Sequence, residues 1–312
     1  MAGPEPIFLL GVSQRSGTHY LYDLLVAHPD CRPALSRTSW EGSWEDQLVR
    51  FSGLLAEYAD RVVASNRLND PALRGLLLRH IGAGLLAVLA EIDGESSADD
   101  PRRPVTKTPL TENLQHFADL FGATPLIVLI RDPRATVASS LRTFGGPAER
   151  WLRTWRDGAR RVAAYVDAHP EVVVARYEDL YADPVRELSR IFTGVRVDPG
   201  RYDFDAVAAL PVRGSSELGG ERHAINWEPM APTEAFDPAA RGKELAPDVL
   251  RRLRWLAAAE MTRFGYADPP DPPPIVEAAG QRIRDVGQGS AEWARLMADG
   301  VARLRARRWR QR

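Results

Sequence analysis

A short loop near the N-terminus carries the residues whose types and spacing are best suited to chemistry. Gly11 and Gly17 enclose five residues that include Arg15 and Ser16, and Thr18 follows directly. Glycines let a backbone approach a ligand closely, an arginine supplies a fixed positive charge, and the two hydroxyl groups donate hydrogen bonds. This combination predicts a binding site for an anion, most often a phosphate group.

The segments on either side of this loop are predicted to be a buried strand and an amphipathic helix. Residues 7–12 form an apolar run of the kind expected for a parallel strand covered on both faces. After the loop, Leu21, Leu24 and Leu25 are spaced for one helix face, and Pro29 ends the pattern. A helix that begins there directs its free N–H groups and the positive end of its dipole at the anion.

The loop departs from that of nucleotide-hydrolysing P-loop proteins. Those proteins have four residues between the two glycines, followed by a lysine and a serine or threonine. This chain has five residues there and continues with Thr18 and His19. The lysine and the magnesium-holding hydroxyl are therefore out of register, which counts against a nucleotide or small-molecule kinase. That kinase remains an alternative at this stage.

A second strand is expected over residues 126–130, and it ends at Arg131. Asp132 and Pro133 are typical of a helix start, and Ser139 lies eight residues beyond Arg131. Because ligands of open α/β sheets bind at the carboxyl ends of the strands, Arg131 is predicted to face the same crevice as the first loop. Two other interpretations stay open, namely Asp132 as a magnesium ligand and Arg131 with Asp132 as a surface ion pair.

Lys107 stands out because the chain has only two lysines, Lys107 and Lys243, among 41 basic residues. The protein uses arginine wherever a generic positive charge is sufficient. A lysine ammonium is a compact charge that suits a small anion rather than a bidentate contact. We therefore expect Lys107 to contribute to an anion site, with an ordinary surface charge as the alternative.

These segments together resemble the sulfotransferases, which use 3′-phosphoadenosine 5′-phosphosulfate (PAPS). The sequence QRSGT is similar to the family's phosphosulfate loop, although Gln14 replaces a proline and His19 replaces a common threonine. IRDPRATVASS resembles the segment that binds the 3′-phosphate, and the lysine of KTP resembles the one beside the transferring sulfuryl group. The resemblance covers roughly residues 6–266. It implies an α/β protein with a three-layer, P-loop-like fold, whose central parallel sheet is flanked by helices.

The resemblance also implies roles for individual residues, with PAPS as donor, PAP (adenosine 3′,5′-bisphosphate) as product and no metal. The backbone of residues 15–18 and the side chains of Arg15, Thr18 and Lys107 would hold the 5′-phosphate, and Arg131 and Ser139 would hold the 3′-phosphate. In RYEDL the tyrosine would contact adenine, and PVRGSS would close over the cofactor. The implied cofactor ligands are Arg15, Ser16, Gly17, Thr18, His19, Arg131, Ser139, Tyr177, Arg213 and Ser215.

The general base and the acceptor are less well defined. In the branch of the family that uses glutamate, the base follows a His-Pro pair, which His28 and Pro29 match here. Glu41 is then the first choice and Glu45 the second. His19 is the third candidate, and its alternative role is an extra contact to phosphate. The implied acceptor is a hydroxyl or amine of a small molecule or carbohydrate.

Length and composition predict one large α/β domain over residues 1–268, with a helical insertion at about 36–103. A Pro-rich linker and a basic helical tail would follow over residues 269–312. Residues 281–312 contain nine arginines and three acidic residues, a net charge of +6. Three roles of this tail stay open: docking on the domain, pairing of two copies into a homodimer, and contact with a protein or anionic partner.

The composition argues against several classes of protein. The net charge of −1 gives no indication of binding to nucleic acid or membranes. Cys31 is the only cysteine, the N-terminus lacks the pattern of a signal peptide, and no apolar run reaches the ~20 residues of a membrane span. We therefore expect a cytoplasmic protein. A non-catalytic nucleotide-binding member of the fold is the second alternative to a sulfotransferase.

Overall fold

The computed structural model describes residues 4–34, 44–65, 71–91, 100–205, 242, 245–266 and 278–287. One sheet of five parallel strands runs through these residues in the order β2-β3-β1-β4-β5. The strands are β1 (Ile7–Gly11), β2 (Cys31–Pro33), β3 (Arg103–Thr108), β4 (Leu126–Ile130) and β5 (Val173–Arg176). The predicted central parallel sheet is confirmed.

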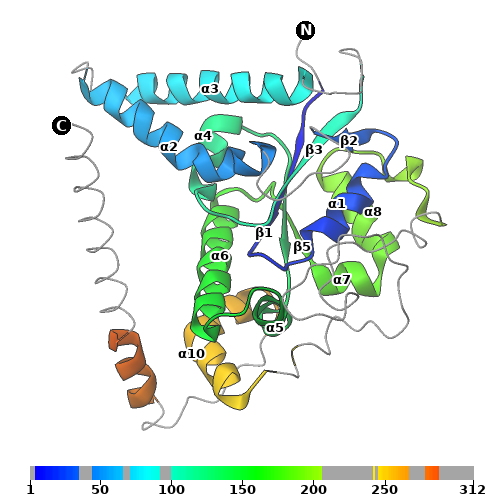
Figure 1. Cartoon of the computed structure of the whole chain (residues 1–312). Helices are drawn as coiled ribbons and strands as arrows, with labels where there is room; N and C mark the ends of the chain where they lie inside the picture. Colours follow the sequence, from blue (N-terminus) through cyan, green and yellow to red (C-terminus); the bar gives the residue numbers. More distant parts are fainter. Residues whose placement is uncertain are drawn as a thin grey trace.

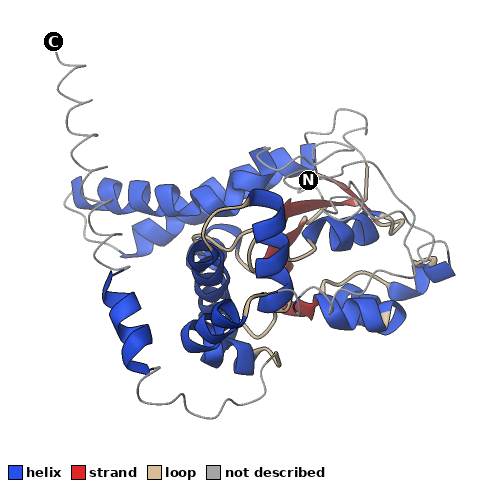
Figure 2. Cartoon of the chain, turned by 60° about the horizontal axis from the view of Figure 1, so that its bottom comes forward, coloured by secondary structure: helices blue, strands red, loops and turns tan. Residues whose placement is uncertain are grey.

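Helices cover both faces of the sheet (Figure 1), and the strands lie between them when the molecule is turned (Figure 2). The alternation along β1 explains the two cores: Ile7 and Leu9 pack on one face, whereas Phe8 and Leu10 pack on the other. The first face is covered by α1 (Thr18–Val26), α7 (Tyr177–Ala182) and α8 (Pro184–Gly194), and the short η2 (Pro199–Arg201) follows α8. The other face is covered by η1 (Leu114–His116), α4 (Phe117–Phe121), α5 (Pro133–Phe144), α6 (Ala148–Ala168) and α10 (Pro247–Arg263).

Two helix starts are set by an aspartate followed by a proline. The carboxylate of Asp132 accepts a hydrogen bond from the backbone N–H of Arg134 at 2.8 Å, and α5 begins at Pro133. Asp183 accepts from the backbone N–H of Arg186 at 3.1 Å in the same way before α8. Each aspartate satisfies an N–H group that has no partner within its helix. The start of α5 at Asp132 and Pro133 was predicted from the sequence, and Asp183 with Pro184 repeats the same pattern.

The helical insertion is confirmed in its described part, but two neighbouring strands were not predicted. The insertion contains α2 (Trp44–Ser65) and α3 (Pro71–Glu91), which form a hairpin beside the sheet in Figure 1. The strands β2 and β3 lie just before and just after it. The strand β2 has only three residues, and both strands carry polar residues and a proline, so they lack the apolar run by which β1 and β4 were recognised.

The helix α3 is more apolar than expected from the sequence. Its stretch Ala72–Leu89 is long and apolar enough by composition to cross a membrane, and 17% of that stretch is buried. The stretch contains Arg74 and Arg79, so it is not an uninterrupted apolar run of the ~20 residues that the sequence was expected to lack. Leu78 and Leu89 belong to the main core, and Gly82 lies directly against the carbonyl oxygen of Leu120. These contacts are those of a helix packed on a domain.

The first part of the basic tail docks on the domain. Residues 278–287 form a helix, and the buried guanidinium of Arg252 on α10 donates to Gln281 at 2.9 Å and to Asp285 at 2.6 Å. The same guanidinium donates to Glu149 of α6 at 2.7 Å. Trp255 adds an N–H···O bond to Asp285 at 2.9 Å. Most of the predicted linker and residues 288–312 lie outside the described residues.

Candidate active site

Strand register brings the predicted site segments to one edge of the sheet. Leu10 of β1 pairs with Thr108 of β3, and Gly11 pairs with Leu129 of β4. On the far side of β4, Ile130 pairs with Arg176 of β5. The residues that follow these strand ends are therefore neighbours at the carboxyl edge, where ligands of open α/β sheets bind.

The loop after β1 is a compact turn held by its own serine. The hydroxyl of Ser16 donates to the carbonyl oxygen of Ser13 at 2.7 Å and accepts from the Ser13 N–H at 3.3 Å. Arg15 and Gly17 have left-handed backbone angles, with φ of 69° and 93°. Directly after this turn α1 begins at Thr18, so its free N–H groups lie at the sheet edge as predicted.

Gly17 is required by the aromatic ring of Tyr177. A Cβ atom at position 17 would lie 2.4 Å from two carbons of that ring, and the left-handed φ disfavours any other residue. Tyr20 of α1 makes an edge contact with Tyr177 at 6.1 Å between ring centroids. Burial, with a smaller effect of the neighbouring tyrosines, raises the pKa of Tyr20 to about 12, so it stays neutral and adds no negative charge here.

Arg131 is fixed in the crevice by three neighbours. Its guanidinium carbon lies 4.4 Å from the ring centroid of Tyr177, which is a cation–π contact. Its Nη1 donates to the carbonyl oxygen of Arg15 at 3.4 Å. Its own carbonyl oxygen accepts from the indole N–H of Trp155 at 3.0 Å. The side chain is 4% exposed, so the surface ion pair considered earlier does not describe it.

Asp132 serves the helix start instead of a metal. Its carboxylate accepts from the backbone N–H of Arg134 at 2.8 Å and from the Nε of Arg134 at 2.9 Å. The N–H of Asp132 donates to Glu178 at 2.9 Å. The carboxylate of Asp132 is therefore bonded to the first turn of α5. This explains why an aspartate stands before the proline at this helix start.

Ser139 and Arg15 meet although 124 residues separate them. The Nε of Arg15 donates to the hydroxyl of Ser139 at 3.1 Å, and Ser139 is buried on α5. Arg131 also contacts Arg15. The loop after β1, which resembles the phosphosulfate loop, is therefore in direct contact with the segment from Arg131 to Ser139, which resembles the 3′-phosphate segment. The predicted pairing of these two motifs in one site is therefore present in the structure.

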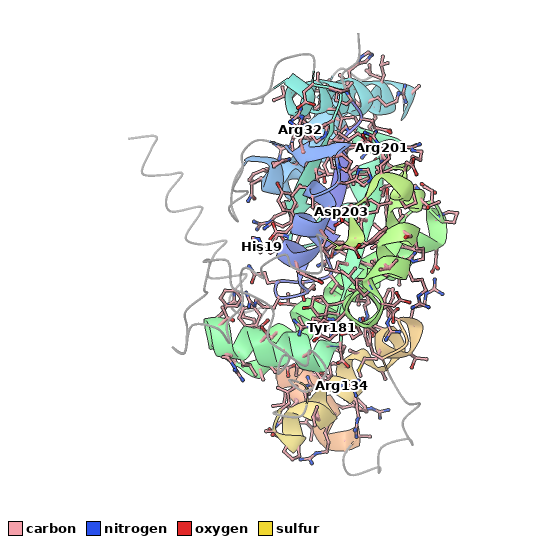
Figure 3. The ribbon with its side chains drawn as sticks, turned by 90° about the vertical axis from the view of Figure 1, so that its right-hand side faces the viewer. His19, Arg32, Arg134, Tyr181, Arg201 and Asp203 are labelled. Atoms are coloured by element: carbon pink, nitrogen blue, oxygen red, sulfur yellow. The ribbon has the colours of Figure 1, made fainter. Side chains whose placement is uncertain are left out.

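Lys107 is fully buried at the end of β3 and contacts His19. Its Nζ lies 2.9 Å from Nε2 and 3.2 Å from Nδ1 of the imidazole. In the view of Figure 3, His19 lies at the start of α1, below Arg32 and above Arg134. A buried ammonium group is costly unless it is hydrogen-bonded, so Lys107 is a functional candidate rather than a surface charge. Lys107 and His19 were both predicted site residues.

Four of the predicted site residues cannot be placed in this way. Glu41, Arg213 and Ser215 lie outside the described residues. Glu45 lies in the first turn of α2, and its side chain is outside the described part. Of the three candidates for the general base, His19 is therefore the one whose side chain the structure describes.

His28, which marks the His-Pro pair, has a structural role. Its Nε2 lies 2.9 Å from the carbonyl oxygen of Asp198, and its Nδ1 accepts the backbone N–H of Asp30 at 3.0 Å. A carbonyl needs a donor and an N–H needs an acceptor, so the ring is the neutral tautomer with its proton on Nε2. The ring also stacks on Tyr202 at 5.7 Å.

Two residues that support the site were not predicted from the sequence. Trp155 of α6 holds the carbonyl oxygen of Arg131, as described above. Gly158, one turn further along α6, lets that helix touch the carbonyl oxygen of Val12, because a Cβ there would lie 1.9 Å from that oxygen. A glycine in the middle of an amphipathic helix is the signal that points to such a close approach.

The arrangement places two groups of residues that are suited to anions at one edge of the sheet. The first consists of the start of α1 with Lys107 and His19, and the second of Arg131, Ser139 and Arg15. Helix N-termini and guanidinium groups are both suited to phosphate oxygens. A ligand with two separate charged groups fits this set better than a ligand with one.

Comparisons with solved structures found several similar chains. The Synechococcus PCC 7002 olefin synthase sulfotransferase domain has 20% identity and a TM-score of 0.47, over 86% of this chain and 98% of that domain. The sulfotransferase domain of the curacin biosynthetic pathway has 18% identity and a TM-score of 0.47, over 85% and 98%. Mouse sulfotransferase SULT7A1, solved with PAP, has 14% identity and a TM-score of 0.43, over 82% and 84%.

A search of curated proteins found no match. A sequence model described as the sulfotransferase family matches residues 6–199, a span that includes the loop after β1, Lys107, Arg131 and Tyr177. Because this span is more than half of the 312 residues, the chain belongs to the sulfotransferase family of enzymes.

Proposed function

We propose that this protein transfers a sulfuryl group from PAPS to a hydroxyl or amine of a small-molecule or carbohydrate acceptor. The observation that carries the proposal is the pair of anion-binding groups at one sheet edge. PAPS has charged groups at both its 5′ and 3′ positions, whereas all the phosphates of ATP are at the 5′ position. The residues Arg131 and Ser139 would therefore serve to distinguish PAPS from ATP.

At the 5′ position, the backbone of residues 15–18, the Thr18 hydroxyl and the side chain of Arg15 would bind the phosphate. Lys107 would donate to the oxygen that bridges phosphorus and sulfur. In an in-line transfer the acceptor oxygen forms a bond to sulfur while this bridging S–O bond breaks, and negative charge builds on the departing oxygen of PAP. A buried ammonium stabilises such charge strongly because little water screens it. Tyr177 remains the candidate for the adenine contact, and Arg213 and Ser215 for closure over the nucleotide.

A general base must take the proton of the acceptor, a step that typically contributes ~10²- to 10⁴-fold. The contact with Lys107 argues against His19 in this role. A ring nitrogen that accepts a hydrogen bond from an ammonium has its lone pair engaged and is a weaker base. We therefore keep Glu41 as the proposed base, with Glu45 as second choice, and propose His19 as the partner that orients Lys107.

Thermal unfolding of the purified protein alone, with PAP, and with ATP and magnesium tests the donor. A ligand at 100 times its dissociation constant adds ~2.7 kcal/mol of stability, which corresponds to a shift of several degrees. We expect a shift with PAP. A shift with ATP and magnesium alone would refute the proposal in favour of a kinase. Binding of PAP without turnover of any acceptor would instead indicate a non-catalytic nucleotide-binding protein.

The base is tested by matched substitutions once an acceptor is found by screening for PAP release. Glu41→Gln is expected to bind PAP normally and to lose transfer, because the amide cannot take a proton. Glu45→Gln is the matched control and is expected to retain transfer. The reverse pattern would assign the base to Glu45. Loss of transfer in neither variant would leave His19 as the remaining candidate for the base.

A further inference from the structure

The peptide group that joins Arg131 to Asp132 lies between the last residue of β4 and the first residue of α5. Its carbonyl oxygen accepts from the indole N–H of Trp155 at 3.0 Å, and its N–H donates to the carboxylate of Glu178 at 2.9 Å. A buried peptide group without such partners would be costly. Both of its polar atoms are therefore satisfied by side chains of other elements, α6 and α7.

Trp155 and Glu178 hold this peptide from opposite faces of the sheet. The described residues contain no cis peptide bond, and in a trans peptide the C=O and N–H groups point in opposite directions. Trp155 belongs to the core on one face, whereas Tyr177, which directly precedes Glu178, belongs to the core on the other. The peptide is therefore restrained on both sides.

Tyr266, which follows α10, connects the two side chains that hold the peptide. Its hydroxyl donates to Glu178 at 2.8 Å, and its ring makes an edge contact with Trp155 at 6.4 Å between ring centroids. Its carbonyl oxygen accepts from Arg134 at 3.2 Å. Burial, together with the charge of Glu178, raises the pKa of Tyr266 well above its usual value, so the hydroxyl keeps the proton that it donates.

The start of α7 also contacts the side chain of Arg131. The ring of Tyr177 lies 4.4 Å from the guanidinium carbon of Arg131, measured to the ring centroid. Two consecutive residues of α7 therefore hold Arg131 at two points: Tyr177 at its guanidinium and Glu178 at the peptide that follows it. A shift of this peptide would move the guanidinium relative to the ring.

We propose that Glu178 and Tyr266 are positioning residues that keep the guanidinium of Arg131 in the orientation that binds the nucleotide. This inference rests on the proposed function, in which Arg131 contacts the 3′-phosphate. Neither residue needs to touch the nucleotide, because both act through the peptide after Arg131. The end of α10 thereby contributes to nucleotide binding, although it belongs to neither of the two groups suited to anions.

A double-mutant cycle tests whether Glu178 acts through Arg131. The ligands are PAP and adenosine 5′-monophosphate (5′-AMP), which lacks the 3′-phosphate, and affinities come from the dependence of the unfolding temperature on ligand concentration. Glu178→Ala should lower the affinity for PAP about 5- to 30-fold and that for 5′-AMP by less than about two-fold. In the Arg131→Ala background it should lower PAP affinity by less than about two-fold, because the interaction through which it acts is already lost.

Two further variants separate positioning from a loss of stability. Glu178→Gln keeps an oxygen that can accept from the N–H of Asp132, so its PAP affinity should stay within about three-fold of that of the unaltered protein. Tyr266→Phe removes only the hydroxyl and serves in case Glu178→Ala folds poorly. It should lower PAP affinity about 2- to 5-fold, since Glu178 keeps its bond to the peptide.

Tyr202→Phe is the matched control for Tyr266→Phe. Tyr202 is also buried, and its hydroxyl donates one hydrogen bond, to the carbonyl oxygen of Leu24 at 2.7 Å. Both substitutions remove one buried hydrogen bond, so they should lower the unfolding temperature of the ligand-free protein to a similar extent. Tyr202→Phe is expected to leave the affinity for PAP unchanged.

Several results would overturn the inference. An equal loss of PAP affinity from Glu178→Ala in the two backgrounds would mean that Glu178 does not act through Arg131. Unchanged PAP affinity, a loss for 5′-AMP as large as that for PAP, or a loss in Glu178→Gln as large as in Glu178→Ala would overturn it as well. If Glu178→Ala does not fold, equal PAP affinities of Tyr266→Phe and Tyr202→Phe would do so. Failure of the unaltered protein to bind PAP would instead refute the proposed function.

Discussion

Replacement of Gly158 by alanine tests whether α6 sets the position of the loop after β1. A Cβ atom at position 158 would lie 1.9 Å from the carbonyl oxygen of Val12. Non-bonded atoms of this kind do not approach within 3.0 Å, so the helix or the loop must move by about 1 Å. Val12 is itself tied to β4, because its N–H donates to the carbonyl oxygen of Leu129 at 3.0 Å. The displacement is therefore expected to pass into residues 13–17.

The magnitude follows from two opposing effects. Alanine is favoured over glycine inside a helix by about 1 kcal/mol. Overpacking of a well-packed site costs about 1–3 kcal/mol or more. Because the obstacle is a backbone atom that cannot rotate away, we expect Gly158→Ala to lower the free energy of unfolding by about 1–2 kcal/mol net. The unfolding temperature should fall by about 1.5–3 °C, because the entropy of unfolding of a chain of 312 residues is about 0.65 kcal/mol/K.

Gly84→Ala on α3 is the matched control, since a Cβ there has no atom within 4 Å. The same substitution is expected to raise stability by about 0.5–1 kcal/mol, as for an exposed helix position. The assay is thermal unfolding of both variants, together with PAP binding. Gly158→Ala should also bind PAP at least about ten-fold more weakly, as a misplaced loop implies. A stabilised Gly158→Ala variant with unchanged PAP affinity would refute the reasoning.

Three further predictions concern single side chains. Arg131→Ala should weaken PAP binding by ~1.5–3 kcal/mol, the range for a hydrogen bond to a charged group, and calorimetry showing a smaller loss would contradict its assignment. Cys31 is buried, and burial raises the pKa of its thiol to about 12, so a thiol reagent at pH 8 should label the native protein very slowly and more slowly still with PAP. Rapid labelling measured by mass spectrometry would exclude the buried position. Arg252→Ala should leave Glu149 and Asp285 with Arg153 as the shared cation that remains among the described residues, and loosen residues 278–287, seen as faster tryptic cleavage there with unchanged PAP affinity. Cleavage at the rate of the unaltered protein would show that Arg252 does not hold this helix.

The part of the fold that could be predicted from the sequence is the part where local signals are strong. β1 and β4 are runs of apolar residues, and α5 and α8 begin with an aspartate and a proline. Each of these signals acts within a few residues, so no knowledge of the tertiary structure is needed. The strand β3 has no such signal, because its buried positions include Thr106, Lys107 and Thr108.

The candidate site was predictable to the extent that its residues carry their own motif. Arg15, Gly17, Arg131 and Ser139 stand in recognisable segments, and the structure brings these segments together. The contact between Arg15 and Ser139 could not be predicted, because it depends on a left-handed backbone angle at position 15. The roles of Trp155 and Gly158 depend in turn on where α6 crosses the sheet.

The strand order explains why residues so distant in sequence form one site. β1 is the central strand, with β3 on one side and β4 on the other. The loop after β1 therefore lies between Lys107 at the end of β3 and Arg131 after β4, whatever the length of the segments between them. The insertion that contains α2 and α3 separates β2 from β3 in sequence but leaves the carboxyl edge unchanged. This strand order therefore allows the insertion to vary in length and sequence without moving the residues at the carboxyl edge.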